Sequence, residues 1–247
     1  GAGLMIRTFQ QLSRVEVGFR DPQEVQTFQI TIPFATVGDP GLVARRQSDI
    51  LDRIGAIPGV TDVAFTSRLP MGGGFSMTDL LFPEGKSFSQ SDRPKPRHFR
   101  FISPRLFETL RIPVVAGRDL TWTDVFERRP VVLVSENLAR AEWGGPQQAI
   151  GKRLRGSSAA DQWREIVGVI GDVRDSEVRE PPRELVYFPV LVERIFNNPT
   201  YVWPFVTYVI RSPRTGTPGF LDEIRQAVWT IDSDLPLANV RTMGDVL

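Results

Sequence analysis

A strand–helix–strand pattern stands near each end of this 247-residue chain, and this repetition constrains the fold more than any other feature. Residues 25–34 (VQTFQITIPF) alternate between apolar and polar side chains as a half-buried strand does, and residues 60–66 are predicted to be the next strand. The helix between them ends before Pro58-Gly59, and its apolar residues fall on one side: Val43, Ile50, Ile54 and Ile57. The first pattern is therefore β-α-β.

The same order returns near the C-terminus. Residues 202–211 are predicted to be one strand in spite of Pro204, and residues 237–240 another. The helix between them is marked by apolar residues at helical spacing: Phe220, Ile224, Val228 and Ile231. We expect the two ends to pair into one split subdomain, residues 23–71 and 201–247, into which residues 72–200 insert an α/β subdomain. The predicted fold class is α+β with two subdomains.

The inserted part contains its most regular pattern between Pro130 and Asp172. The run 131–134 is unbroken and apolar, which is typical of a strand covered on both faces. Ser135 is a candidate N-cap for a helix over 136–143, and a second apolar strand is expected at 166–170. The remaining elements are predicted as strands at 79–85, 97–102 and 184–190, an extended segment at 111–117, and a short helix that Ser103-Pro104 begins.

Composition excludes several functional classes. The chain has 41% hydrophobic and 24% charged residues, which is typical of a globular protein, and its net charge of +1 provides no field that would gather nucleic acid. It has no cysteine, so disulfides, thiolate metal sites and cysteine nucleophiles are excluded. No apolar run approaches the length of a membrane span, so we expect the chain as given to be soluble. A basic cluster, Arg93, Lys95, Arg97 and Arg100, is interrupted by prolines and is predicted to be a solvated loop.

No residue pattern indicates catalysis, a cofactor or a metal. The one histidine, His98, is predicted to lie on a sheet surface with its pKa lowered by neighbouring arginines. The segment GPQQAIGK (145–152) resembles a phosphate loop but has the wrong glycine spacing, and Gly72-Gly73-Gly74 precedes no helix, so both are predicted to be turns. Two groups of acidic residues are expected to form turns, caps and surface ion pairs: Asp119, Asp124 and Glu127, and Asp172, Asp175 and Glu177.

Aromatic and methionine residues are the remaining candidates for a binding surface. We expect four aromatic residues to lie in the core or at the junction between subdomains: Phe107, Trp143, Trp163 and Trp229. Met71, Phe75 and Met77 belong to a glycine-rich loop with no evident core to enter. Because exposed apolar loops often contact partners, these three are the candidate partner-facing residues.

Three segments between Val131 and Asp175 carry a family resemblance: VVLVSENLARAEWGG, AIGKRLR and IVGVIGDVRD. They resemble the extracytoplasmic core domain of MacB-type, FtsX-like ABC transporter permeases, and so does the preceding block FISPRLFETLRIPVVAGRDLTWTD. Residues 1–19 are similar to the exit from the family's leading membrane helix, and residues 231–247 to the approach to the next one. Within the family, the chain looks closest to the second such domain of permeases that carry two.

The resemblance implies a non-catalytic domain, periplasmic or extracellular, of an inner-membrane permease. It would transmit ATP-driven movement across the membrane to export substrate, with no cofactor of its own. The implied partners are the flanking transmembrane helices, a cytoplasmic ABC ATPase subunit, a second permease domain and a periplasmic adaptor, while no nucleic acid is expected. Residues 1–22 would be the membrane-exit helix and linker, so both ends of the domain should lie side by side.

Two alternatives stay open. A ligand- or peptide-sensing outer domain predicts a concave apolar pocket near residues 71–82. A carboxylate-based hydrolase predicts a deep pocket between the subdomains, with paired acids whose pKa values are strongly shifted.

Overall fold

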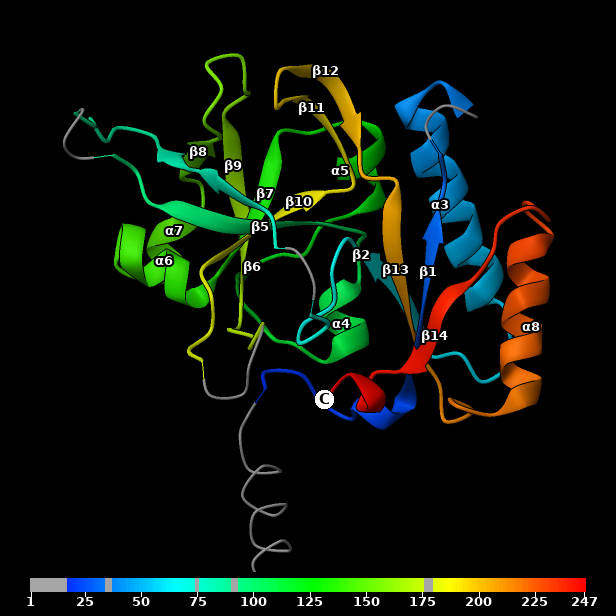
Figure 1. The fold of residues 1–247 in the computed structure, drawn as a ribbon. Helices are drawn as coiled ribbons and strands as arrows, with labels where there is room; N and C mark the ends of the chain where they lie inside the picture. The colour runs from blue at the N-terminus through cyan, green and yellow to red at the C-terminus, as the bar shows by residue number, and fades with distance from the viewer. Residues whose placement is uncertain (1–16, 34–36, 74–75, 90–92, 176–179) are drawn as a thin grey trace, which may run out of the picture.

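The structure is a computed structural model, and it describes residues 17–33, 37–73, 76–89, 93–175 and 180–247 (Figure 1). Most of the predicted membrane-exit helix falls on residues 1–16, which lie outside this part of the chain. Among the described residues, each helix is too short or too polar to cross a bilayer.

The strands of the described residues are β1 (Val25–Thr31), β2 (Asp62–Thr66), β3 (Thr78–Leu80), β4 (Phe82–Pro83), β5 (Pro96–Ile102), β6 (Val114–Gly117), β7 (Val131–Ser135), β8 (Arg153–Arg155), β9 (Arg164–Ile170), β10 (Leu185–Pro189), β11 (Leu191–Ile195), β12 (Asn198–Val202), β13 (Phe205–Arg211) and β14 (Ala238–Thr242). The helices are α3 (Pro40–Gly55), α4 (Leu106–Leu110), α5 (Trp122–Phe126), α6 (Glu136–Trp143), α7 (Pro146–Ala149) and α8 (Pro218–Trp229), with short 3-10 turns η1 (Pro22–Glu24) and η2 (Gly244–Val246).

Among the described strands, 12 form one mixed sheet in the order β14-β1-β13-β2-β5-β10-β7-β9-β8-β4. β3 lies beside β5, β6 lies beside β9, and β11 and β12 form a separate hairpin. The predicted α+β class is confirmed at this level. The division into two subdomains stays a prediction, because the sheet continues from the terminal strands into the middle of the chain.

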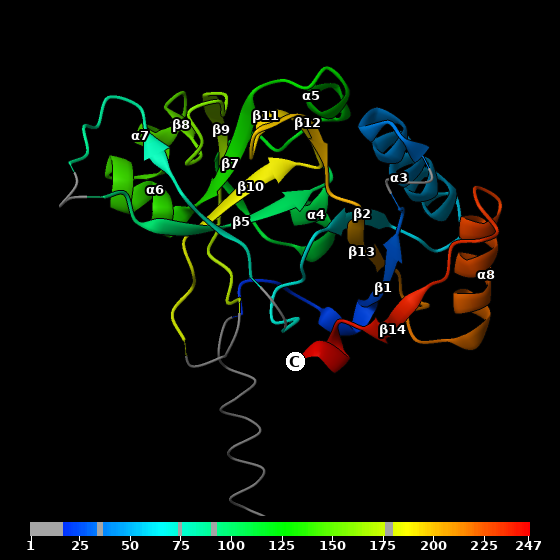
Figure 2. The same ribbon diagram turned by 45° about the horizontal axis from the view of Figure 1, so that its top comes forward.

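Both β-α-β patterns form, and they meet within the sheet. β1 pairs antiparallel with β13, with Val25 opposite Arg211, while β14 and β2 add to the outer sides of this pair. α3 and α8 lie next to each other over these strands (Figures 1 and 2). Their apolar sides pack on the strand residues Phe28 and Tyr208, so hydrophobic burial holds the two chain ends together. α3 begins where the side chain of Asp39 accepts a hydrogen bond from the Gly41 N–H at 2.6 Å.

The middle strands are mostly buried on both faces. β5 pairs parallel with β10, and β7 pairs parallel with β9, while β10 and β7 run antiparallel. Every residue of β7 is buried, as its unbroken apolar run predicted. A cluster on one face, which includes Phe99, Phe101 and Phe188, packs against Leu138 and Ala139 of α6.

A second apolar cluster is shared by the terminal and middle strands. It joins Val25 and Val209 of the terminal strands to Phe107 of α4 and to Leu133 and Tyr187 of the middle strands. The face of the terminal strands that α3 and α8 leave open is therefore covered by residues of the inserted segment.

Pro204 separates two strands instead of lying within one. The sequence predicted a single strand over 202–211, but β12 ends at Val202 and β13 begins at Phe205. Proline has no N–H to donate to a ladder, and here it lies where the chain leaves the β11–β12 hairpin for the main sheet.

Helix starts also differ from the sequence prediction. Ser103 does not cap a helix: its Oγ accepts from the Phe65 N–H at 2.8 Å, and α4 begins only after Arg105. The sequence prediction assigned no helix after Asp119, but the chain enters α5 there, which a reciprocal cap between Thr121 and Asp124 begins. The predicted turn at 145–152 contains the four-residue helix α7. Short helices of this kind lack the periodicity that reveals longer ones.

Candidate functional site at the end that carries both termini

Both ends of the described chain lie at one end of the molecule, here called the terminal end (Figures 1 and 2). Val17 and Val246 pack against the same apolar cluster. The Met243 N–H also donates to the Val25 carbonyl oxygen at 2.8 Å, so the last residues are fixed beside the first strand.

The first described residues, 17–24, form a strap across the terminal end. Its start is tied to the loop after β9, because the Arg174 N–H donates to the Val17 carbonyl oxygen at 3.1 Å. Gly18 has φ of +91°, and a Cβ there would overlap the Asp172 carbonyl oxygen, so the strap and this loop approach as only glycine allows. Further along, the Arg20 N–H donates to the Leu110 carbonyl oxygen at the end of α4 at 3.2 Å.

A buried ion cluster lies next to the strap and is centred on Asp175. The Asp175 side chain is 1% exposed and pairs with Arg100, whose side chain is 4% exposed. Arg183 lies 3.7 Å and Arg68 3.9 Å from the Asp175 carboxylate. The Met71 N–H donates to the Asp175 carbonyl oxygen at 3.2 Å, so this residue also holds the turn that follows β2.

These positions correct two sequence predictions. Asp175 was expected in a surface ion pair, and Arg97 and Arg100 in a solvated loop, but all three are buried. The reason is that β5 lies inside the sheet, between β2 and β10, so its arginines are covered and need buried or half-buried carboxylates. Arg97 forms ion pairs with Glu142, at 2.7 Å, and with Glu184.

Burial dominates the protonation equilibria of the cluster. It lowers the pKa of Arg100 to about 10, an effect that Tyr187 opposes, and it raises the pKa of Tyr187 to about 12. The pKa of His98 is also lowered, first by burial and then by Arg183, Arg100 and Arg68. The predicted direction for His98 is therefore confirmed, with burial as the larger cause.

The predicted partner-facing loop lies beside this cluster. Met71 and Met77 are half-buried and contact two different apolar clusters, while Phe75 lies outside the described residues. Ser76 Oγ and His98 Nδ1 are 2.9 Å apart, which fixes the loop to β5. The structure does not test whether the loop binds a partner.

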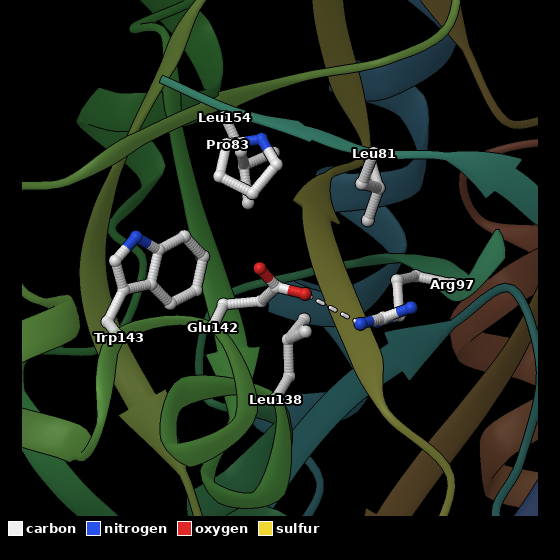
Figure 3. A pocket seen from close by; sticks show the side chains of 7 residues that line it. All are labelled: Leu81, Pro83, Arg97, Leu138, Glu142, Trp143 and Leu154. Atoms are coloured by element: carbon white, nitrogen blue, oxygen red, sulfur yellow. Dashed lines mark hydrogen bonds and ion pairs between the residues drawn. The ribbon is translucent and has the colours of Figure 1, made fainter. Parts of the chain in front are cut away.

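A small cavity lies beside Arg97, near the start of β5, and Figure 3 shows its lining. It has a volume of about 10 Å³ and is lined by Leu81, Pro83, Arg97, Leu138, Glu142, Trp143 and Leu154. The ion pair between Arg97 and Glu142 lies across it (Figure 3). A volume of this size holds about one water molecule, which is far smaller than a ligand pocket. An open groove of about 440 Å³ lies along His98, Arg183 and Glu184, and charged residues and prolines line it together.

The described aspartates whose pKa values are raised by burial lie away from both of these cavities. They are Asp119, Asp161 and Asp172. Asp172 Oδ1 accepts from the Asn137 N–H at 2.9 Å, and Asp119 Oδ1 accepts from the Leu120 N–H at 2.7 Å, which are the capping and turn roles that were predicted. Within the described ranges, no group of three or more acidic or histidine side chains is placed to hold a metal ion.

Trp229 and Asp124 also differ from the sequence predictions. Phe107 lies in the core as expected, but Trp229 of α8 is 42% exposed. Asp124 has the capping role that was among those predicted, but its ion pair with Arg118 is not a surface pair, because the Asp124 side chain is fully buried. Glu177 lies outside the described residues.

Sequence reasoning missed one residue of the terminal end altogether. Arg211 ends the apolar strand VTYVIR and shares a sheet face with Thr207 and Val209, which face the cluster beneath α4. A charge on the inner face of a strand is the signal that could have drawn attention to it.

Comparisons with known proteins agree with the sequence resemblance. A family model described as the MacB-like periplasmic core domain matches residues 15–215. The chain is similar to the crystal structure of the periplasmic region of MacB from Actinobacillus actinomycetemcomitans, with a TM-score of 0.56, 16% identity and 96% of each chain covered. It is also similar to a domain of a putative permease protein from Porphyromonas gingivalis, with a TM-score of 0.52, 18% identity, and 89% of this chain and 90% of that chain covered. At these identities the two structures establish the shared fold. A comparison with curated proteins found no match.

Proposed function

Because the chain belongs to the family of MacB-like periplasmic core domains, we propose that it is a non-catalytic, force-transmitting domain of an ABC transporter permease. Movement of the permease's membrane helices, driven by ATP hydrolysis in a cytoplasmic subunit, would be passed to this domain outside the membrane. The domain would then close against, or part from, a second outer domain and so extrude substrate.

One observation carries this proposal: both ends of the described chain lie at the terminal end, packed on one apolar cluster. A domain that receives movement from two membrane helices needs both connections on the face turned to the bilayer. The strap adds to this support, because it contacts the loop after β9 and the end of α4 within a few residues. A displacement of the strap would therefore reach two parts of the sheet at once.

The partners follow from the same proposal. They are the flanking transmembrane helices, a cytoplasmic ABC ATPase subunit, a second permease domain and, where the system has one, a periplasmic adaptor. We further propose that the terminal segments 23–71 and 201–247 and the inserted segment 72–200 move as two subdomains. The support is the short ladder between β2 and β5, which pairs Thr66 with Ile102.

We also propose that Met71, Phe75 and Met77 face one of these partners. The support is Met71, whose N–H donates to the Asp175 carbonyl oxygen and whose side chain packs on the same apolar cluster as Val17 of the strap. A photo-crosslinking residue at position 75 of the full-length permease should capture another part of the transporter. A yield equal to that of the same residue at the exposed position 226 of α8 would contradict the proposal.

The function can be tested because the domain has no cysteine of its own. One cysteine at the exposed Thr230 and one in the opposite outer domain would carry spin labels in the full-length permease, assembled with its ATPase in liposomes. We expect the distance between the labels to differ between the ATP-bound and ADP-bound states. Joining the two cysteines should slow ATP hydrolysis, and a reducing agent should restore it. An unchanged distance, with hydrolysis unaffected by the crosslink, would refute force transmission.

A further inference from the structure

We propose that Arg211 holds the strap, residues 17–24, against the domain. A displacement of the strap by the membrane helix that would precede it is then passed to β13 and α4. This inference rests on the proposed function and names the place where movement enters the fold. Arg211 acts as a positioning residue, because its effect is exerted through the strap.

The contacts of the Arg211 guanidinium carry the proposal. Its side chain is 4% exposed, and Nε donates to the Thr109 carbonyl oxygen of α4 at 2.7 Å. Nη2 donates to the Arg20 carbonyl oxygen at 3.0 Å, and Nη1 to the Asp21 carbonyl oxygen at 3.2 Å. One planar group therefore joins two consecutive carbonyls of the strap to the helix beneath them, which a point charge such as lysine could not do in the same way.

The buried charge of Arg211 needs the hydrogen-bond acceptors that the strap supplies. Burial is the main cause that lowers its pKa, yet an arginine stays protonated, so the buried charge must be stabilised by acceptors. Among the described residues, the carboxylate that pairs with it is Glu24, at 3.3 Å, which also belongs to the strap and is 47% exposed. If the strap left, the Thr109 carbonyl oxygen would be the one hydrogen-bond acceptor that Arg211 keeps among these described partners. The strap and Arg211 thus hold each other in place.

A second arginine that contacts the strap, Arg111 at the end of α4, shows why Arg211 is the stronger of the two side-chain contacts. Arg111 also pairs with Asp21 and lies 3.5 Å from Glu24, but its side chain is 47% exposed. Exposed pairs of this kind contribute little, because water and salt screen them. The buried, multiply bonded guanidinium of Arg211 is not screened in this way.

Arg211 is also well placed to pass movement on. It ends β13, and its backbone is fixed on both sides: it is opposite Val25 of β1 and opposite Asp62 of β2. A pull on the strap therefore acts on the middle of three paired strands. The same guanidinium engages α4, which belongs to the inserted segment, so both parts of the sheet receive the displacement.

The test compares Arg211→Met with the matched control Arg214→Met. Arg214 lies three positions further along and binds the Pro58 carbonyl oxygen and Glu223, away from the strap. In hydrogen–deuterium exchange on the 247-residue chain, we expect the Arg20 amide of the Arg211→Met variant to exchange at least about tenfold faster than in the unaltered chain, while β7 and β9 keep their protection. Arg214→Met should leave the strap unchanged, and Arg211→Lys should restore part of its protection.

The second arm uses the full-length permease with its ATPase in liposomes. Spin labels at the exposed positions 23 in the strap and 230 in α8 should give one narrow distance in both nucleotide states of the unaltered protein. Arg211→Met should broaden or shift that distance when ATP is bound. A strap that exchanges at the normal rate and keeps one distance in this variant would overturn the proposal. If Arg211→Met does not fold, Arg211→Lys decides by the same two measurements.

The two proposals can fail separately. If the outer domains of the unaltered permease do not move with ATP, force transmission is refuted, but the exchange experiment on the isolated chain still decides whether Arg211 holds the strap. If the outer domains move and the Arg211→Met strap is unaffected, only the clamp is refuted.

Discussion

Asp175 provides the sharpest test of how the terminal end is stabilised. Its buried carboxylate is shared by Arg100, Arg68 and Arg183, so Asp175→Asn removes the one negative charge at the centre of the cluster. The substitution keeps the shape of the side chain. Its cost should therefore come mainly from leaving Arg100, with a side chain 4% exposed, without a counter-ion.

Removing one partner of a buried ion pair costs about 3–5 kcal/mol, because the remaining charge is no longer compensated. A change of 1 kcal/mol shifts Tm by about 2–4 °C in a chain of this size, so we expect Tm to fall by about 6–20 °C. Asp222→Asn is the matched control. It removes a pair with Arg225 in which the aspartate is 72% exposed, and it should cost no more than about 0.5 kcal/mol.

Thermal and urea unfolding of the 247-residue chain would measure both variants. A double variant, Asp175→Asn with Arg100→Met, removes both partners and should be less destabilised than the sum of the single variants by at least about 1 kcal/mol. The reasoning would be refuted if Asp175→Asn cost no more than the surface control. Strict additivity in the double variant would equally show that the carboxylate does not compensate Arg100.

Three further predictions concern single sites. The pKa of His98 is lowered below 6.5 in the folded state, so the unfolded state binds a proton at this residue more readily as pH drops. The free energy of unfolding should therefore decrease as pH falls below 6.5. His98→Asn should lack this decrease in a plot of Tm against pH. A Cβ at Gly168 would overlap the Arg118 carbonyl oxygen, so Gly168→Ala should cost about 1–3 kcal/mol in urea unfolding, whereas Gly219→Ala, which meets open space in α8, should cost nothing. Thr121→Ala removes the reciprocal cap of α5 and should cost about 1 kcal/mol in the same assay, and an unchanged midpoint would contradict that role.

Local patterns were sufficient to predict most of the long elements. The strands β7 and β9 and the helix α6 followed from an unbroken apolar run, a polar residue at the strand end and a glycine stop. The two terminal β-α-β patterns followed from apolar spacing within about 15 residues. These features can be predicted from neighbouring residues, because the side chains that one face of a helix or strand buries recur at short, regular intervals along the sequence.

Features that depend on distant neighbours could not be predicted in the same way. Whether β5 lies inside the sheet or at its edge decides whether Arg97 and Arg100 are solvated, and the alternation of its residues is the same in either place. Pro204 likewise lies within a segment whose residues are all typical of one strand. That the segment divides there follows only from the separate pairing of β12 with β11 and of β13 with β1. Asp175 is a single acidic residue in a loop, and only the fold brings three arginines around it.

The strap and the ion cluster are joined by one short stretch, residues 172–175. Arg174 hydrogen-bonds the start of the strap and the Asp172 carbonyl packs against Gly18, while Asp175, directly after them, pairs with Arg68 of the turn that follows β2. This stretch belongs to the inserted segment and has ion pairs and hydrogen bonds within it, but these contacts also tie it to the strap and to the terminal part of the chain. A displacement at Val17 therefore has two routes into the sheet, one through the loop after β9 and one through Arg211 to β13. The two routes reach opposite sides of the short β2–β5 ladder. Under the proposed function, a pull on the strap would therefore act on that ladder from both sides, as the proposed movement between the two parts of the domain requires.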